Sequence, residues 1–420
     1  MSTPFGIDQK NLLERFVRYA AIGTQSNRRR AEEKTPSTDC QWNLIRLLER
    51  ECRALGFDSV LVTAEGFLIA RLASNLPPER GNAPPCIGFM AHVDTASDAP
   101  GSPVSPRVHE NYSGGIIVLS GGVQIDPADN PSLARYKGET IITSDGTTLL
   151  GADDKAGVAA IMSAAEYLIA HPEIPHGELE CIFTPDEETG LGMNRFPLDT
   201  IHSKAAYTLD GDGEGTVEAE CFTAWKAEAR FTGKVIHIGH ARGKLANAVA
   251  MAARFVDMLP RSESPEATDG SFGYYCPMDI KGNLEEAVAG IFLRDFDEGE
   301  IRRRLEALKA FAAAVEAAFP GGKVSIREEE QYRNMKSAFA RDPRILEYAY
   351  RAVRETGMEP IRKSIRGGTD GARLSEKGVP TPNIFMGGEN FHARTEWVSL
   401  PAMARAAQTV VRLARIWAGA

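Results

Sequence analysis

The chain has 420 residues, of which 43% are hydrophobic and 25% are charged, and its formal net charge is −9 at pH 7. Because this length exceeds what one hydrophobic core usually organises, we expect two domains. The composition is that of an ordinary globular protein. The negative net charge disfavours a broad surface for nucleic acid or for an anionic membrane, so we expect neither as a partner.

The N-terminal segment, "MSTPFGIDQKNLLERF", carries charges throughout and lacks the apolar core of a signal peptide. No apolar run approaches the roughly 20 residues that a membrane helix needs. The six cysteines include no CxxC pair. Scattered cysteines of this kind are typical of reduced thiols, so we expect a cytoplasmic protein without a thiolate metal site.

The first hundred residues predict two helices followed by three strands. Apolar residues at helical spacing indicate a helix over 8–22, with Asp8 as its cap. A polar, basic loop separates it from a second helix over 39–55, which Gly56 would end. The predicted strands lie at 59–63, 67–72 and 86–91.

The next part of the chain alternates strands and helices. Residues 101–115, "GSPVSPRVHENYSGG", hold too much proline and glycine for a regular element. A mostly apolar helix is predicted over 155–170, then a strand over 179–184 that Pro185 breaks, then a strand that runs into Asp210. This alternation indicates an α/β domain with helices packed on a central sheet.

Between residues 222 and 331 the pattern changes to the order β-α-β-β-α-β, which is typical of ferredoxin-like domains. The predicted strands are 225–231, 273–281, 287–294 and 323–328, and the predicted helices are 245–258 and 298–319. We interpret 222–331 as a domain inserted between residues 1–221 and 332–420 of the first. The α/β pattern then resumes, with a helix from Pro343 that Asp342 would cap, a strand at 382–386 and a helix from about residue 400.

Several acidic and imidazole side chains each follow an apolar strand and stand beside a glycine or a turn. They are His92, Asp153, the pair Glu187 and Glu188, Asp210, and His392. Functional groups in α/β sheets gather at the carboxyl ends of strands, so these side chains could meet at one rim. Their carboxylates would repel one another, and divalent cations would offset that repulsion. Imidazole and carboxylate ligands without thiolate suit zinc in an open catalytic site, and also manganese or cobalt.

Two neighbours of these residues predict supporting roles. Asp94 lies two residues after His92 and so faces the same side of the strand. It could accept the other ring N–H of His92 and fix the orientation of the imidazole. The adjacent pair Glu187 and Glu188 suggests that one carboxylate binds metal while the other takes a proton from water.

Taken singly, these residues have simpler explanations. A histidine at a strand end is more often a hydrogen-bonded structural residue, an aspartate beside glycine is usually a turn former, and a pair of glutamates is usually solvated surface. The spacing alone therefore supports a metal site and these structural roles about equally.

The chain resembles the aminotripeptidase (peptidase T) branch of the co-catalytic dinuclear zinc aminopeptidases and carboxypeptidases, nearly from end to end. The motifs that carry the resemblance are "MAHVDT", "TLLGADDKAGVAAIM", "FTPDEETGLG", "AYTLDGDG", "IRGGTDGARLS" and "GGENFHARTEWVSL". The resemblance implies a catalytic domain with a central mixed sheet flanked by helices, and an inserted ferredoxin-like α+β lid domain. It also implies that two zinc ions are bound per subunit, with Co²⁺ or Mn²⁺ as substitutes.

The resemblance further implies a role for each site residue. Asp153 would bridge the two ions, His92 and Asp210 would complete one site, and Glu188 and His392 would complete the other. Glu187 would be the general base, and Asp94 would orient His92.

Four further residues match positions of the family's lid or of the loop facing its cleft. His237 would help to stabilise the oxyanion, Asn247 and Arg294 would contact the substrate, and Arg366 would face the cleft. Two structural alternatives stay open: a salt bridge between Arg294 and its acidic neighbours, and a solvent-facing loop position for His237.

The chain departs from the family pattern at three places. Ile238 stands where the family usually has proline, Glu389 where it usually has an aromatic residue, and Ala393-Arg394-Thr395 where it usually has Gly-Lys-His. These departures leave the metal ligands intact but put strict selectivity for tripeptides in doubt.

We therefore expect a cytoplasmic zinc aminopeptidase that releases the N-terminal residue from short peptides, tripeptides foremost. Two alternatives stay open: a related amidohydrolase on the same metals, such as an N-acyl amino acid acylase or a carboxypeptidase, and a non-catalytic module that binds peptide or metal. The sequence does not fix the oligomeric state, and a homodimer is compatible with it.

Overall fold

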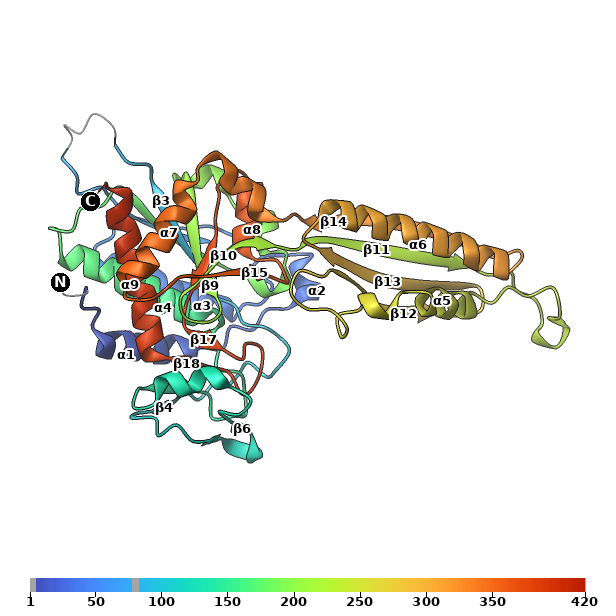
Figure 1. The fold of residues 1–420 in the computed structure, drawn as a ribbon, viewed down its shortest axis with the longest axis horizontal. Coiled ribbons are helices and arrows are strands. Elements are labelled where there is room, and N and C mark those ends of the chain that lie inside the picture. The colour runs from blue at the N-terminus through green and yellow to red at the C-terminus, as the bar shows by residue number, and fades with distance from the viewer. Residues whose placement is uncertain (1–4, 78–82, 420) are drawn as a thin grey trace. The chain divides into compact units, whose positions relative to one another are not determined.

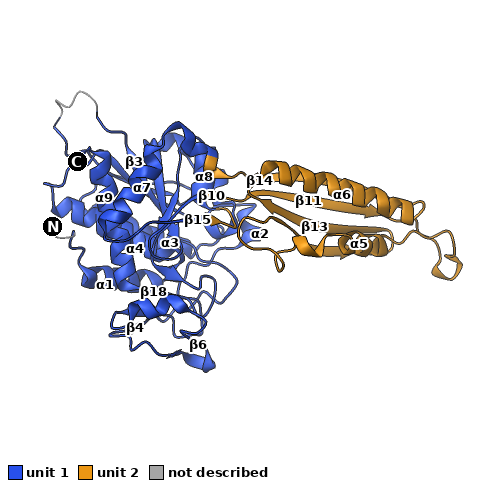
Figure 2. Ribbon diagram, in the orientation of Figure 1, with its two compact units in different colours: residues 1–219, 337–363, 369–420 blue, residues 220–336, 364–368 orange. Residues whose placement is uncertain are grey.

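The computed structural model describes residues 5–77 and 83–419 and divides the chain into two compact units (Figure 2). Unit 1 comprises Met1–Ala219, Ser337–Lys363 and Thr369–Ala420, and unit 2 comprises Glu220–Lys336 and Ser364–Gly368. The first four residues of the predicted charged N-terminal segment lie outside the described residues. Within the described ranges, no helix has the length and apolar content needed to cross a membrane.

The central sheet is mixed, as predicted, and in the described part of the chain it has eight strands in the order β1-β2-β8-β3-β9-β16-β10-β15 (Figure 1). Its strands are β1 (Ser59–Val62), β2 (Leu68–Leu72), β3 (Ile87–His92), β8 (Leu179–Thr184), β9 (Ala205–Gly211), β10 (Thr216–Cys221), β15 (Ile361–Ile365) and β16 (Asn383–Phe385). Strand β3 pairs in parallel with both β8 and β9, whereas β2 pairs antiparallel with β8. Three parallel strands therefore end at the same edge of the sheet.

The helices of unit 1 pack on this sheet and on one another. They are α1 (Gln9–Ala20), α2 (Arg28–Ala31), α3 (Gln41–Leu55), α4 (Ala152–Ala170), α7 (Arg344–Glu355), α8 (Asp370–Glu376) and α9 (Leu400–Trp417). The predicted caps of α1 and α3 are confirmed: the Asp8 carboxylate accepts the first N–H groups of α1, and Gly56 ends α3 with a φ of 90°. The predicted cap of α7 is wrong, because Pro343 is its N-cap, and Asp342, one residue earlier, accepts the N–H of Arg344. Helix α4 contacts β3, β9, α1 and α9, so it is covered on several sides, as its apolar sequence predicted.

Two small sheets complete unit 1. One contains β4 (Arg107–His109), β7 (Ile141–Thr143), β17 (Gly388–Glu389) and β18 (Trp397–Ser399), and the other contains β5 (Ile117–Val118) and β6 (Gln124–Ile125). The prediction of no regular element over 101–115 was wrong at β4. Because β4 has three residues and pairs only with the distant β7, its own sequence carries no strand periodicity. The polar loop predicted before α3 likewise contains the short α2.

Unit 2 has the predicted order of elements, β-α-β-β-α-β. They are β11 (Thr223–Thr232), α5 (Ala248–Asp257), β12 (Tyr274–Gly282), β13 (Glu286–Asp295), α6 (Glu298–Ala318) and β14 (Lys323–Tyr332). The sheet order is β12-β13-β11-β14. Alternate residues of β11, namely Ala227, Ala229 and Phe231, enter a core shared with α5 and α6, which gives unit 2 its own hydrophobic centre.

Candidate metal centre

The parallel strands of unit 1 bring the predicted ligands to one edge of the sheet. His92 is the last residue of β3, and Asp210 lies near the end of β9. Glu188 lies in the short 3₁₀ helix η3 (Glu187–Thr189) that follows β8. Because these three strands run parallel, their carboxyl ends meet at a single edge, which is where the sequence predicted the site.

Asp153 lies between the two imidazoles of the site. Its Oδ1 is 2.9 Å from Nε2 of His92, and its Oδ2 is 3.3 Å from Nε2 of His392. One carboxylate therefore offers a separate oxygen to each of two histidines.

The five predicted ligands form two groups of three that share Asp153. In the first group, His92 joins Asp153 and Asp210, with 3.7 Å between Nε2 of His92 and Oδ1 of Asp210. In the second group, His392 joins Asp153 and Glu188, with 3.0 Å between Nε2 of His392 and Oε2 of Glu188. Within each group, one ligand atom from each residue lies within 4.8 Å of the others, which is close enough to surround a metal ion.

The backbone at His392 lies in the left-handed region, with a φ of 61°. A non-glycine residue adopts this conformation only when its surroundings enforce it, and such residues cluster at functional sites. The conformation therefore agrees with a functional position for this side chain.

Burial and mutual repulsion shift the pKa values of two site carboxyls, those of Glu188 and Asp210, upward. Burial raises the pKa of Glu188 to about 7, with the charge of Asp153 adding to it, and burial raises the pKa of Asp210 to about 6. Although burial would raise the pKa of Asp153 as well, the two histidines outweigh it and hold the pKa of that carboxyl below its usual range. A cluster of buried acids is thus held together at an electrostatic cost that positive charge would offset.

The residues present fit a pair of divalent cations. Oε1 of Glu188 is buried and has no hydrogen-bond partner among the described residues, so the second group contains an unsatisfied anionic ligand atom. The remaining ligand atoms are imidazole nitrogens and carboxylate oxygens without thiolate, which is the ligand set of open zinc, cobalt and manganese sites.

Glu187 lies beside the cluster but belongs to neither ligand group. In the described residues, no hydrogen bond or ion pair holds its carboxylate. Its backbone N–H donates to Oδ1 of Asp94, and its backbone carbonyl accepts the N–H of Gly190. Burial, followed by the charge of Asp210, raises the pKa of Glu187 well above its ordinary value. An unpaired carboxyl with a high proton affinity is suited to accept and release a proton during a reaction.

Asp94 contacts both His92 and the η3 turn. The nearest acceptor to Nδ1 of His92 is the backbone carbonyl of Asp94, at 3.1 Å, while Oδ1 of the carboxylate lies at 3.5 Å. The carboxylate instead accepts the backbone N–H groups of Glu187 and Glu188, at 2.9 and 3.2 Å. The residue thus holds the imidazole mainly through its main chain and the glutamate turn through its side chain.

Three further acidic residues support the site and were missed by the sequence analysis. The Glu396 carboxylate accepts the N–H groups of Leu150, Gly151 and Asp153. Asp154 accepts the N–H of His92 at 3.2 Å. The Asp186 carboxylate, just before Glu187, accepts hydrogen bonds from Ser37 and Gln41. All three lie within the quoted family motifs. Asp154 and Asp186 stand directly beside a predicted site residue, which was the available signal for these two.

Two of the predicted substrate contacts lie in loops of unit 2. His237 is exposed, and its Nδ1 accepts the N–H of Gly239 at 3.2 Å. Asn247 is the N-cap of α5, where its side-chain oxygen accepts the N–H groups of Val249 and Ala250. A structural role is therefore visible for the oxygen of Asn247, while its amide nitrogen has no partner among the described residues.

Arg294 and Arg366 also lie in unit 2, packed on aromatic rings. The Arg294 guanidinium lies 4.9 Å from the ring centre of Phe292 and forms no ion pair in the described part of the chain. The alternative of a salt bridge with its acidic neighbours is wrong, because the adjacent Asp295 pairs with Arg304 at 2.5 Å. The guanidinium of Arg366 donates hydrogen bonds to Thr268 and to the carbonyls of Gly270 and Phe272.

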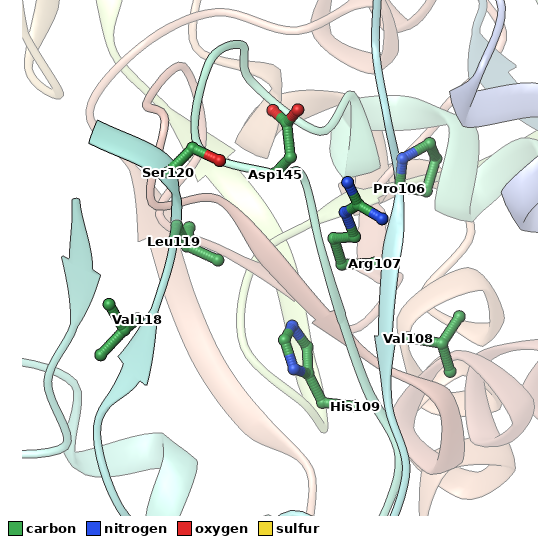
Figure 3. Close-up of a pocket in the computed structure, with 8 residues that line it drawn as sticks. All are labelled: Pro106, Arg107, Val108, His109, Val118, Leu119, Ser120 and Asp145. Atoms are coloured by element: carbon green, nitrogen blue, oxygen red, sulfur yellow. The ribbon is translucent and has the colours of Figure 1, made fainter. Parts of the chain in front are cut away.

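A separate open pocket of about 450 Å³ lies between β4 and β5 (Figure 3). Its lining residues are Pro106, Arg107, Val108, His109, Val118, Leu119, Ser120 and Asp145. The polar side chains include one cation and one carboxylate, and none of the predicted site residues lines it. This pocket therefore offers no cluster of ligands comparable with the one around Asp153.

Known proteins resemble this chain over most of its length. The model of peptidase family M20/M25/M40 matches residues 143–416. A protein named peptidase T from Geobacillus thermodenitrificans is 44% identical over 412 residues, which cover 97% of this chain and 98% of that protein.

Solved structures share the fold over nearly the whole chain. The crystal structure of the aminopeptidase PepT from Bacillus cereus superposes with a TM-score of 0.75 at 24% identity, covering 98% of this chain and 99% of that one. A dinuclear metal-binding peptidase of the M20 family from Bacillus subtilis superposes with a TM-score of 0.66 at 15% identity, covering 97% and 98%. From the family match and the extent of the sequence identity, this chain belongs to peptidase family M20/M25/M40.

Proposed function

We propose that this chain is an aminopeptidase dependent on two divalent metal ions, zinc first, that releases the N-terminal residue from tripeptides and other short peptides. The position of Asp153 carries the proposal, because its two oxygens lie 2.9 and 3.3 Å from the Nε2 atoms of His92 and His392. The names of its relatives support the same activity, since the protein from Geobacillus thermodenitrificans is called peptidase T.

In the proposed site, one metal would be held by His92 and Asp210, the other by Glu188 and His392, and both by Asp153. When bound, the cations would polarise the scissile carbonyl and lower the pKa of a water molecule toward neutrality. Glu187 would take the proton of the attacking water as the new C–O bond forms. It would then deliver that proton to the nitrogen of the leaving amine as the C–N bond breaks.

The proposed working compartment is the cytoplasm. All six cysteines are free thiols, as is usual where glutathione keeps proteins reduced. The assignments of His237, Asn247, Arg294 and Arg366 to the substrate stay predictions. Alanine substitution at each of them should raise KM or lower kcat while the number of bound metal ions stays at two.

A substrate screen on the metal-loaded protein tests the proposal. Free di-, tri- and tetrapeptides would be compared with N-acylated amino acids and N-acetylated peptides, with and without a chelator. We expect free tripeptides to lose their first residue, in a reaction that the chelator stops and added zinc restores. Hydrolysis of the blocked substrates alone would identify a related amidohydrolase, and no turnover of any substrate would identify a binding module.

A further inference from the structure

Three backbone segments that carry predicted ligands are each held by a buried carboxylate from another segment. Asp94 accepts N–H groups of the η3 turn, and Asp154 accepts the N–H of His92. Glu396 accepts three N–H groups of the loop that leads to Asp153. Because a carboxylate of one segment accepts backbone N–H groups of another, this arrangement can fix the loops relative to one another.

Glu396 makes the most extensive of these contacts. Its Oε2 accepts the N–H groups of Leu150 and Gly151, both at 2.8 Å, and its Oε1 accepts the N–H of Asp153 at 2.9 Å. The side chain is buried, with 1% of the residue exposed. Among the described residues, all hydrogen bonds of its carboxylate go to this one loop, so the side chain is dedicated to the backbone around Asp153.

The backbone around Asp153 depends on contacts of this kind, because the helical hydrogen bonds of α4 do not hold it in place. Asp153 and Asp154 have non-helical backbone angles, with φ −80° and ψ 103° at Asp153. The preceding Gly151 has a φ of 76°, and a Cβ atom there would lie 3.1 Å from the Thr95 side chain and 3.2 Å from Nζ of Lys155. Regular helical backbone thus begins after Asp154, and the orientation of Asp153 depends on contacts from outside the helix.

That orientation matters more for Asp153 than for the other ligands, since it is shared by both groups. A small rotation of its backbone would move Oδ1 away from His92 and Oδ2 away from His392 together. Misplacement of a functional group by about 1 Å can lower the rate of a reaction by roughly a hundredfold.

We propose that Glu396 is a positioning residue, which sets the Asp153 carboxylate so that it can serve two metal ions at once. The inference rests on the proposed function and adds a residue through which both metal sites are coupled. Glutamine at position 396 has the same size but only one acceptor oxygen. Its single oxygen can replace only one of the two carboxylate oxygens of Glu396. The amide NH₂ group would therefore face either the N–H of Asp153 or the N–H groups of Leu150 and Gly151.

Glu180 provides a matched control away from the metal ligands. It is a fully buried glutamate whose carboxylate accepts the backbone N–H groups of His202 and Ser203 and pairs with Arg71 at 2.8 Å. Glu180→Gln removes the same kind of contact from the same kind of environment. It should lower the melting temperature without changing the affinity for zinc.

The experiment compares wild type, Glu396→Gln and Glu180→Gln in the full chain. Zinc affinity is measured by competition with a chromogenic chelator, and the melting temperature and kcat/KM are measured alongside. We expect Glu396→Gln to weaken the binding of both ions by about 10- to 100-fold, the usual effect of losing a residue that orients a metal ligand, and Glu180→Gln to leave it within about twofold. If Glu396→Gln does not fold, Glu396→Asp, which withdraws the carboxylate by one methylene, takes its place.

Two results would overturn the inference. One is a Glu396→Gln variant that binds both ions as tightly as wild type while its melting temperature falls as much as that of Glu180→Gln. The other is weaker binding of only one of the two ions, because Asp153 is shared by both ligand groups. Failure of the wild-type protein to bind two ions would instead contradict the proposed function itself.

Discussion

At the scale of single residues, the site separates two adjacent glutamates into different roles. Glu188 points an oxygen at His392, whereas the Glu187 carboxylate has no hydrogen-bond partner among the described residues. The spacing could predict that the pair divides its work, and the family resemblance implied that Glu188 binds metal while Glu187 serves as the base. The structure adds how the turn is held, since Asp94 accepts the backbone N–H groups of both residues.

Glu187→Gln should remove the proton acceptor and keep the metal site. We expect kcat to fall by about 10²- to 10⁴-fold, the usual contribution of a general base, with two ions still bound. Steady-state kinetics and elemental analysis check this result. Glu188→Gln is the matched variant and should lose the ion on the His392 side. Unchanged kcat in Glu187→Gln would show that another group accepts the proton.

A second residue-scale prediction concerns Glu218 on β10. This glutamate is 4% exposed, and burial raises its pKa to about 8 from an ordinary value of 4.5. The folded state therefore holds the proton more tightly than the unfolded state. The stability that this provides is fully present below about pH 4.5 and is lost as the pH rises to about 8.

Glu218→Gln cannot ionise and should not show this loss. Relative to wild type, its free energy of unfolding should become larger, meaning greater stability, as the pH rises from about 5 to about 8. Urea denaturation at several pH values measures the difference, with Glu14→Gln on the exposed surface of α1 as the control. A difference that does not change with pH would mean that Glu218 is not a buried acid in solution.

At the scale of elements, the fold was predictable where one segment carries its own signal. Strand β8 lies where the apolar run before Pro185 placed it, and α1 and α3 have their predicted caps. Strands β4 and β17 were not predictable, because these segments of three and two residues carry no periodicity of their own and exist only through pairing with β7 and β18.

The same reasoning explains what was missed in the site. The ligands each follow an apolar strand and can be recognised locally. Glu396 cannot, since its partners Leu150 and Asp153 lie 246 and 243 residues away in the chain. Its role depends on the packing of α4, β18 and the loop before them, and no local pattern in "ARTEW" reports that.

The loop of residues 268–272 in unit 2 gives an element-scale prediction. Arg366 donates to its carbonyls and lies 5.0 Å from the ring centre of Phe222. Arg366→Ala should therefore free this loop, and hydrogen exchange at 268–273 should become faster. Arg327→Ala, an exposed arginine of the same unit, is the control. A raised KM with unchanged exchange would instead favour the substrate contact that the family resemblance implies.

At the scale of the whole molecule, the chain is built from two units with separate cores, and the candidate metal centre lies in unit 1. The five ligands come from both sides of the insertion: four of them precede it, and His392 follows it. Formation of the centre therefore requires the segments of unit 1 that precede and follow the insertion to come together. The residues predicted to contact the substrate belong to unit 2. The predicted metal ligands and the predicted substrate contacts therefore lie in different units.

Anomalous diffraction at the zinc absorption edge, from a crystal grown with excess zinc, tests the central claim most directly. The account predicts two peaks about 3.5–4 Å apart, the usual separation in two-metal sites, with the Asp153 carboxylate between them. His92 and Asp210 should contact one peak, and Glu188 and His392 the other. A single peak, or two peaks without Asp153 between them, would contradict it.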